Sequence, residues 1–128
     1  CIRERNLNSI NIMKSIEIVY GLRNFIGNAN KFAKEKIFIN IKSDNGFTEI
    51  TIEDDGEGYP KDVLNKIGEP YIKSFKSSNK SKAGLGLGIF IGTTLLEKNH
   101  ATVFCKNSKI RSGAEVIIRW ENKKLLEL

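Results

Sequence analysis

The sequence lacks the features that mark several other classes of protein. Among its 128 residues are two cysteines, Cys1 and Cys105, and a single histidine, His100. One histidine and no C-x-x-C pair leave no residue set for a zinc site, and two cysteines without a secretory signal predict reduced thiols in a cytosolic domain. No apolar run approaches the roughly 20 residues that a membrane-spanning helix needs, and no signal peptide is visible.

A net charge of +6 is the one compositional feature that favours a nucleic-acid partner. The lysines are not evenly spread, however, since Lys73, Lys76, Lys80 and Lys82 crowd one short polar stretch. The sequence shows no interleaving of aromatic and basic residues of the kind that stacks bases. A small polyanion such as a nucleoside triphosphate satisfies this distribution as well as DNA does, and we expect no nucleic-acid partner.

The chain length and the apolar periodicity predict one α+β domain, a two-layer sandwich with helices on one face of a mixed, mostly antiparallel sheet. The predicted elements are a helix over 16–33, strands over 36–43 and 47–54 joined by a turn, a short helical turn near 60–66, a long polar loop over 68–83, a helix over about 88–97, and strands near 101–106 and 114–120. We expect residues 1–14 to be the flank of a truncated protein, because the chain begins at Cys1, with the domain over 15–122 and a tail over 123–128.

The first predicted helix carries a polar cluster on one side. At about 100° per residue, Asn24, Asn28 and Lys31 fall within about 60° of one another, opposite the apolar face. Asparagine is a poor helix former, so this cluster costs helix stability. It is either a solvated polar face or a site where an amide oxygen meets Mg²⁺ and an ammonium group meets a phosphate.

Asp54 ends the second predicted strand on the face that also carries Ile50 and Ile52, which should be buried. A buried carboxylate needs donors, and a purine amino group supplies one. Gly56 and Gly58 would let the backbone pass close to a planar ring. The alternative interpretation is an Asx-type turn over Asp54-Asp55-Gly56.

A third glycine-rich segment, Gly84-Leu85-Gly86-Leu87-Gly88, precedes the apolar helical run. It is neither the dinucleotide fingerprint, because Ile89 stands where the third glycine belongs, nor a P-loop. Glycines that open a helix expose backbone N–H groups to a phosphate, but a flexible joint between loop and helix has the same pattern.

In this order, Asn-x-x-x-Asn, Asp-x-Gly-x-Gly and Gly-x-Gly-x-Gly resemble the N, G1 and G2 boxes of the GHKL ATP-binding family. That family includes DNA gyrase, the heat-shock chaperone ATPase, MutL and the histidine kinases. Gly68-Glu69-Pro70-Tyr71 with Phe75 is similar to the F box, and Gly113-Ala114 lies where the family has a Gly-Thr pair. "YGLRNFIGNANKFA" and "GLGLGIFIGTTLLE" are similar to segments of the RegB/PrrB-type sensor kinases.

The resemblance implies the Bergerat fold, ATP and Mg²⁺ as ligands, and a role for each matching residue. Asn28 corresponds to the Mg²⁺-binding residue, Lys31 to the phosphate-contacting lysine and Asp54 to the adenine-reading carboxylate, with Gly58 beside the ring. The glycines of the third box would hinge a lid over about 68–83. The other residues expected to bind ATP are Asn24, Phe32, Gly56, Tyr71, Gly84, Leu85, Gly86, Leu87, Gly88 and Gly113.

Asn24 separates the classes within the family. Hydrolytic members have a glutamate base there, whereas histidine kinases resemble this chain. The resemblance therefore implies the catalytic domain of a histidine kinase that acts on a histidine in a separate helical hairpin of the same parent, with a cognate response regulator as partner. The parent is expected to be a homodimer in the bacterial inner membrane, with this domain in the cytoplasm. His100 is expected at the surface, outside the site. The alternatives are a stand-alone anti-sigma-factor kinase, another GHKL ATPase, or a non-catalytic nucleic-acid-binding module.

Overall fold

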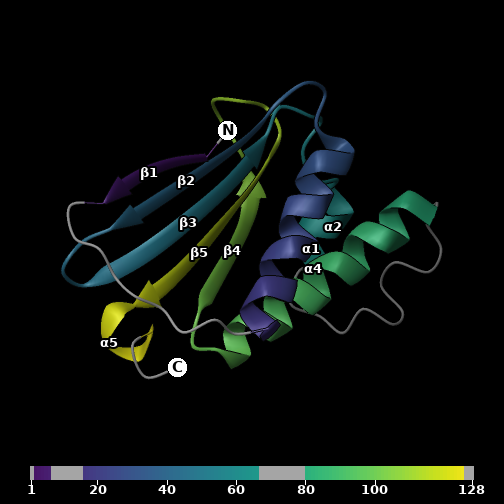
Figure 1. Cartoon of the computed structure of the whole chain (residues 1–128). Coiled ribbons are helices and arrows are strands. Elements are labelled where there is room, and N and C mark those ends of the chain that lie inside the picture. The colour runs from purple at the N-terminus through teal and green to yellow at the C-terminus, as the bar shows by residue number, and fades with distance from the viewer. Residues whose placement is uncertain (1, 7–15, 67–79, 126–128) are drawn as a thin grey trace.

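The computed structural model describes residues 2–6, 16–66 and 80–125 (Figure 1). In chain order the elements are β1 (Ile2–Asn6), α1 (Ile16–Phe32), β2 (Ile37–Ser43), β3 (Phe47–Asp54), α2 (Lys61–Lys66), α4 (Lys80–Lys98), β4 (Thr102–Asn107), β5 (Ala114–Glu121) and α5 (Asn122–Leu125). None of the helices in these ranges is long and apolar enough to cross a bilayer.

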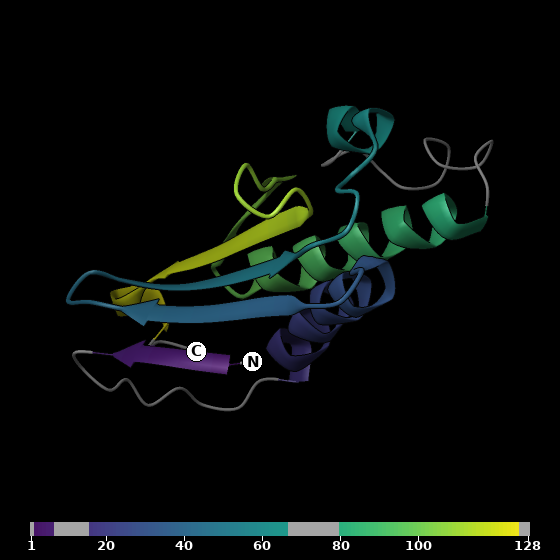
Figure 2. The same cartoon turned by 90° about the horizontal axis from the view of Figure 1, so that it is seen from above.

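The strands form one five-stranded sheet in the order β1-β2-β3-β5-β4. The pairings β2–β3, β3–β5 and β4–β5 are antiparallel, and β1 runs parallel to β2. Helices α1 and α4 pack against each other on one side of the sheet (Figures 1 and 2). The predicted fold class, a mixed and mostly antiparallel sheet with a helical layer, is confirmed.

Strand alternation places the core between the sheet and the two long helices. Ile52, Val116 and Ile118 face the helices and are buried, as are Phe25 of α1 and Leu96 of α4. Two glycines bring the helices close together: a Cβ at Gly21 would lie 2.7 Å from Leu96 Cγ, and one at Gly92 would lie 2.6 Å from Phe25 Cε2. This close packing fixes α1, which carries the polar cluster, against α4.

The predicted hairpin turn is confirmed, and it is tied to the end of the chain. Asp44 Oδ1 accepts hydrogen bonds from the backbone N–H groups of Gly46 and Phe47, each at 2.8 Å. The buried side chain of Asn122 donates to the Asp44 carbonyl oxygen at 2.6 Å and accepts from the Thr48 hydroxyl at 2.6 Å. The start of α5 therefore anchors the β2–β3 hairpin.

The structure corrects three boundaries. The flank assigned to 1–14 contributes β1, whose pairing is made by backbone groups and needs little side-chain pattern. The predicted tail 123–128 begins too early, because Leu125 of α5 is only 1% exposed and belongs to the core. Helix α4 begins at Lys80 rather than near residue 88. The helix therefore includes Gly84 and Gly86, although glycine is among the poorest helix formers.

Candidate functional site

A cavity of about 400 Å³ lies beside the C-terminal half of α1 and the end of β3. Its polar lining combines one amide, two lysines and two carboxylates, which is the mixed character of a small-molecule site. The lining residues are Phe25, Asn28, Ala29, Lys31, Phe32, Lys34, Ile52, Asp54, Glu57, Gly58, Tyr59, Pro60, Ala114 and Val116.

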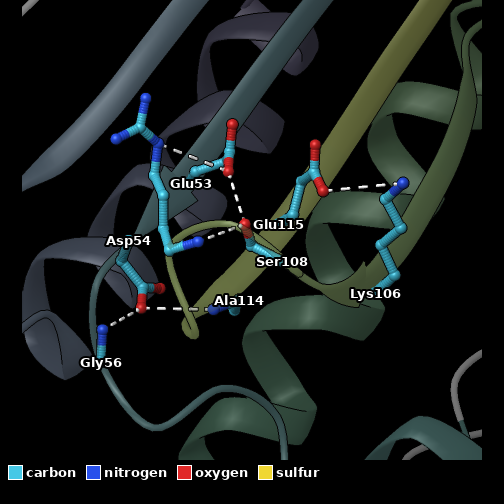
Figure 3. Close-up of polar contacts among 8 residues, drawn as sticks. Glu53, Asp54, Gly56, Lys106, Ser108, Ala114 and Glu115 are labelled. Atoms are coloured by element: carbon cyan, nitrogen blue, oxygen red, sulfur yellow. Dashed lines mark hydrogen bonds and ion pairs between the residues drawn. The ribbon is translucent and has the colours of Figure 1, made fainter.

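Asp54 is a buried carboxylate at this cavity, only 2% exposed. Its Oδ1 atom accepts the backbone N–H of Gly56 at 2.8 Å and that of Ala114 at 3.3 Å (Figure 3). Burial raises the pKa of this carboxyl, while the two backbone donors act in the opposite direction. The predicted burial is confirmed, and the bond to Gly56 shows that the Asx-type turn, offered as an alternative, exists together with the cavity.

Two glycines are required because the backbone passes so close to this carboxylate. A Cβ at Gly113 would collide with the Asp54 carbonyl oxygen and Oδ1, and a Cβ at Gly56 would collide with the Phe32 carbonyl oxygen. Both carbonyl oxygens belong to the backbone and cannot move aside as the end of a flexible side chain could. Gly56 and Gly113, both predicted to bind ATP, do not line the cavity but let Asp54 and the end of α1 reach their places.

Asn28 presents an unusual amide to the cavity. Its Nδ2 atom is buried and, among the residues that the structure describes, has no hydrogen-bond partner. Leaving such a group unpaired costs about 1–3 kcal/mol. A Cβ at Gly88 would lie 3.1 Å from both the Nδ2 and Oδ1 atoms, so the glycine gives α4 room to pass beside this amide. An unpaired amide at the edge of a cavity is a candidate ligand contact.

Two lysines bring positive charge to the cavity, beside its two carboxylates. Lys31 and Phe32, both predicted site residues, line it, and Lys31 Nζ lies 5.4 Å from the centre of the Phe32 ring. Lys34 lines it too, although the sequence pattern gave it no role. Asn24 does not line the cavity: its Nδ2 atom donates to the Tyr20 carbonyl oxygen at 2.8 Å, one turn earlier in α1.

The glycine-rich segment is arranged differently from the prediction. Gly84, Leu85 and Gly86 lie inside α4, so the expectation that this segment opens a helix is wrong. Backbone N–H groups inside a helix are bonded to carbonyl groups four residues earlier and are not free for an anion. Leu87 is 41% exposed and, like Gly88, does not line the cavity. Tyr71 and most of the predicted lid fall outside the described residues.

Asp55 is a structural residue that the sequence reasoning treated only as part of a turn. Its carboxylate accepts the backbone N–H groups of Lys34, Glu35 and Lys36, with shortest distances of 2.8, 3.0 and 3.2 Å. The bond from Glu35 is the main cause that holds its pKa below the ordinary value, and those from Lys36 and Lys34 contribute. Asp55 thus fixes the segment after α1, including Lys34, against the end of β3.

Tyr59, which is buried, and Cys105, which is half-buried, form a pair behind the loop that follows β3. Tyr59 lines the cavity and is buried, and its pKa is raised well above the ordinary value, chiefly by burial. Burial raises the pKa of the Cys105 thiol to about 12, while its hydrogen bond with Tyr59 acts in the opposite direction. Cys105 is a free thiol, as expected, and it is protonated at neutral pH.

On the opposite face of β3 from Asp54, Glu53 holds the loop between β4 and β5 (Figure 3). Glu53 Oε2 accepts from the Ser108 hydroxyl at 2.8 Å and lies 3.6 Å from Arg111 Nε. The Ser108 hydroxyl oxygen also accepts the Arg111 backbone N–H at 3.1 Å. This loop ends at Gly113, so the contacts fix the backbone that touches Asp54.

His100 lies far from the cavity. Its neighbours Lys98 and Asn99 contact the carboxylate of Glu17, in the first turn of α1, at 2.9 and 3.4 Å. From Glu17 to Asn28 the helix rises roughly 16 Å, at about 1.5 Å per residue. His100 is exposed and occupies the turn that ends α4, as predicted.

Residues 13–124 match the model of a protein family described as histidine kinase-, DNA gyrase B-, and HSP90-like ATPase. The sensor histidine kinase RegB of Cereibacter sphaeroides is 35% identical over 102 residues, covering 76% of this chain and 22% of RegB. Sporulation kinase A of Bacillus subtilis is 35% identical over 83 residues, covering 65% of this chain and 12% of that protein. The chain therefore spans about a fifth of the length of RegB and a smaller share of sporulation kinase A.

Solved structures of the same fold include the catalytic domain of the histidine kinase ThkA. It superposes with a TM-score of 0.72 at 21% identity, covering 94% of this chain and 79% of that one. At this identity the likeness establishes the fold.

Proposed function

Because this chain belongs to the histidine kinase-, DNA gyrase B-, and HSP90-like ATPase family, we propose that it is the ATP-binding catalytic domain of a two-component sensor histidine kinase. Its role is to deliver the γ-phosphoryl group of Mg·ATP to a histidine on a separate helical domain. The observation that carries this proposal is Asp54, a buried carboxylate in a cavity that also presents Lys31 and Lys34.

Asp54 is the proposed adenine-reading residue. Its Oδ1 atom is occupied by two backbone donors, and the carboxylate still has acceptor capacity for the amino group of adenine. Guanine presents a carbonyl oxygen at that position, so two acceptors would meet. Gly58, Tyr59 and Ala114 supply the neighbouring walls of the cavity.

The phosphate end of the site is proposed to lie between Asn28 and Lys31. The unpaired Nδ2 atom of Asn28 is a donor that suits a phosphate oxygen. The Oδ1 atom of the same amide is one of the hard oxygen ligands that Mg²⁺ takes alongside phosphate oxygens and water. Bound Mg²⁺ would neutralise charge on the phosphates. Lys31 and Lys34 add positive charge at the same cavity, and phosphoryl transfer depends mainly on such positioning and charge neutralisation.

Asn24 distinguishes the kinase proposal from a hydrolase. An amide cannot accept a proton near neutral pH, and this one is bonded to the Tyr20 carbonyl oxygen. The chain therefore has no general base at the position where hydrolytic GHKL members carry glutamate, which also disfavours the alternative of an anti-sigma-factor kinase. A purely nucleic-acid-binding role would not explain why a carboxylate is buried at this cavity.

We infer the partners from the same role. They are the histidine-bearing helical hairpin of the parent protein, which we expect to be a homodimer, and a cognate response regulator. The parent is proposed to reside in the bacterial inner membrane with this domain on the cytoplasmic side. His100 is not the acceptor, because it lies at the far end of α4.

Radiolabelled ATP tests the kinase proposal. The isolated chain should bind ATP, hydrolyse it very slowly and remain unlabelled, whereas a mixture with the helical hairpin of its parent should yield an acid-labile, base-stable phosphohistidine. His100→Ala should leave this transfer intact. Rapid phosphate release by the chain alone would favour another GHKL class, and labelling at His100 would refute the assignment of the acceptor.

A further inference from the structure

The loop that follows β3 forms one wall of the cavity, and a distant side chain binds its backbone. Asn107, the last residue of β4, accepts the Tyr59 backbone N–H at its Oδ1 atom, at 2.6 Å. Its Nδ2 atom donates to the carbonyl oxygen of the same residue at 3.2 Å. One side-chain amide therefore satisfies both backbone groups of Tyr59, although 48 positions separate the two residues.

Gly58 is shaped to receive this amide. Its φ is +84°, a left-handed backbone conformation that residues other than glycine rarely adopt. A Cβ at this position would lie 2.7 Å from Asn107 Oδ1 and 3.0 Å from its Cγ. The glycine is thus needed on both counts: for the direction of the chain, and for the space that the amide fills.

Asn107 itself is held by the sheet. It pairs with Ala114 of β5, which lines the cavity and donates its backbone N–H to Asp54. The amide therefore connects two walls of the same cavity, the Ala114 side through strand pairing and the Tyr59 side through hydrogen bonds. Asn107 does not line the cavity.

We propose that Asn107 is a positioning residue that fixes the Gly58–Pro60 wall of the nucleotide cavity. This inference rests on the proposed function, since it concerns the site that would hold adenine. Without the amide, the wall must be ordered when the nucleotide binds, and that cost appears as weaker binding. The phosphate end, where Asn28 and Lys31 lie, keeps its geometry.

Two variants of Asn107 separate its two hydrogen bonds. Asn107→Leu keeps a similar volume and removes both, and Asn107→Asp keeps the acceptor for the Tyr59 N–H but replaces the donor with a second acceptor. Calorimetric titration with ADP and Mg²⁺ should give a Kd about tenfold higher for the leucine variant, and an intermediate rise for the aspartate variant. Hydrogen exchange at the Tyr59 amide should accelerate in the leucine variant and less in the aspartate variant.

Asn122 offers a matched control at the other end of the sheet. Its amide also bridges distant segments, through Thr48 and the Asp44 carbonyl oxygen, and it is more buried than Asn107. Asn122→Leu should therefore lower the thermal midpoint at least as much as Asn107→Leu while leaving the Kd for ADP unchanged. A purely structural role for Asn107 would make the two variants behave alike.

The titrations separate a failure of this inference from a failure of the proposed function. If the unmodified chain binds ADP and folded Asn107→Leu binds it with the same Kd, the inference is overturned while the proposed function stands. If the unmodified chain does not bind ADP, both fail. If the leucine variant does not fold, Asn107→Asp decides: an unchanged Kd together with unchanged exchange at Tyr59 contradicts the inference.

Discussion

Gly113→Ala tests how closely the β5 backbone approaches the buried carboxylate. The added Cβ would collide with the carbonyl oxygen and the Oδ1 atom of Asp54. The Asp54 backbone cannot move away freely because it pairs with Ile37 of β2 in the sheet. Over-packing of this kind costs about 1–3 kcal/mol, and contact with backbone puts this case at the upper end. We therefore expect the free energy of unfolding to fall by about 2–3 kcal/mol.

Gly27→Ala is the control that carries the same chemical change. Gly27 lies inside α1 with nothing within 4 Å of the added Cβ. An alanine there should stabilise the chain by up to about 1 kcal/mol, because glycine is the costlier residue in a helix interior. Urea unfolding, followed by circular dichroism, measures both variants against the unmodified chain.

Gly113→Ala should also weaken nucleotide binding. Relief of the collision requires β5 to move from the end of β3, which lengthens or breaks the bond from the Ala114 N–H to Asp54. We expect a Kd for ADP raised by about tenfold, with Gly27→Ala unchanged. If Gly113→Ala were as stable as Gly27→Ala and bound ADP with unchanged affinity, the proposed dependence of Asp54 on close backbone packing would be refuted.

Three further predictions address other parts of the structure. Asn28→Ala should abolish the Mg²⁺ dependence of ATP binding without unfolding the chain, since alanine favours the helix; nucleotide titrations with and without Mg²⁺ check it, and unchanged dependence argues against Asn28. His100→Gly should raise stability by about 0.5–1 kcal/mol, because His100 has a φ of +72° where it ends α4; a lower thermal midpoint would count against this. Since backbone donors hold the pKa of Asp55 below its unfolded-state value, its contribution is present at neutral pH and is lost as the pH falls below about 4. In Asp55→Asn the free energy of unfolding should accordingly fall less steeply as the pH drops below about 4. Identical plots of unfolding free energy against pH for the variant and the unmodified chain would contradict that.

Local patterns were sufficient for much of the fold and part of the site. Helical periodicity predicted α1 to within one residue at its end, and alternation predicted β2 and β3 with the turn between them. The same parity argument predicted the burial of Asp54, because a strand residue shares its face with its neighbours two positions away.

Elements that depend on tertiary contacts were missed. Strand β1 has one apolar residue in Ile2–Asn6 and is defined by backbone pairing with β2, which leaves no mark in its own sequence. The start of α4 was placed late because the glycines were expected to open the helix, whereas they lie inside it. Because glycine is a poor helix former, no local pattern in this stretch predicts the longer helix.

The contacts that complete the site had the weakest signals. Asn107 and Tyr59 are 48 positions apart, and no local pattern links them. Asp55 follows Asp54 and was read as part of the same turn, but its partners are backbone N–H groups about 20 positions earlier. Contacts between a side chain and a distant backbone can be assigned only once the fold has brought the segments together.

We propose that Asp54 makes this cavity an adenine site. Calorimetric titration of the 128-residue chain with ADP and with GDP, each with Mg²⁺, tests it most directly. Because guanine would place a carbonyl oxygen against the buried carboxylate, at a cost of about 1–3 kcal/mol, we predict that ADP binds about tenfold more tightly or better. Equal affinities for the two nucleotides, or no binding of either, would contradict the account.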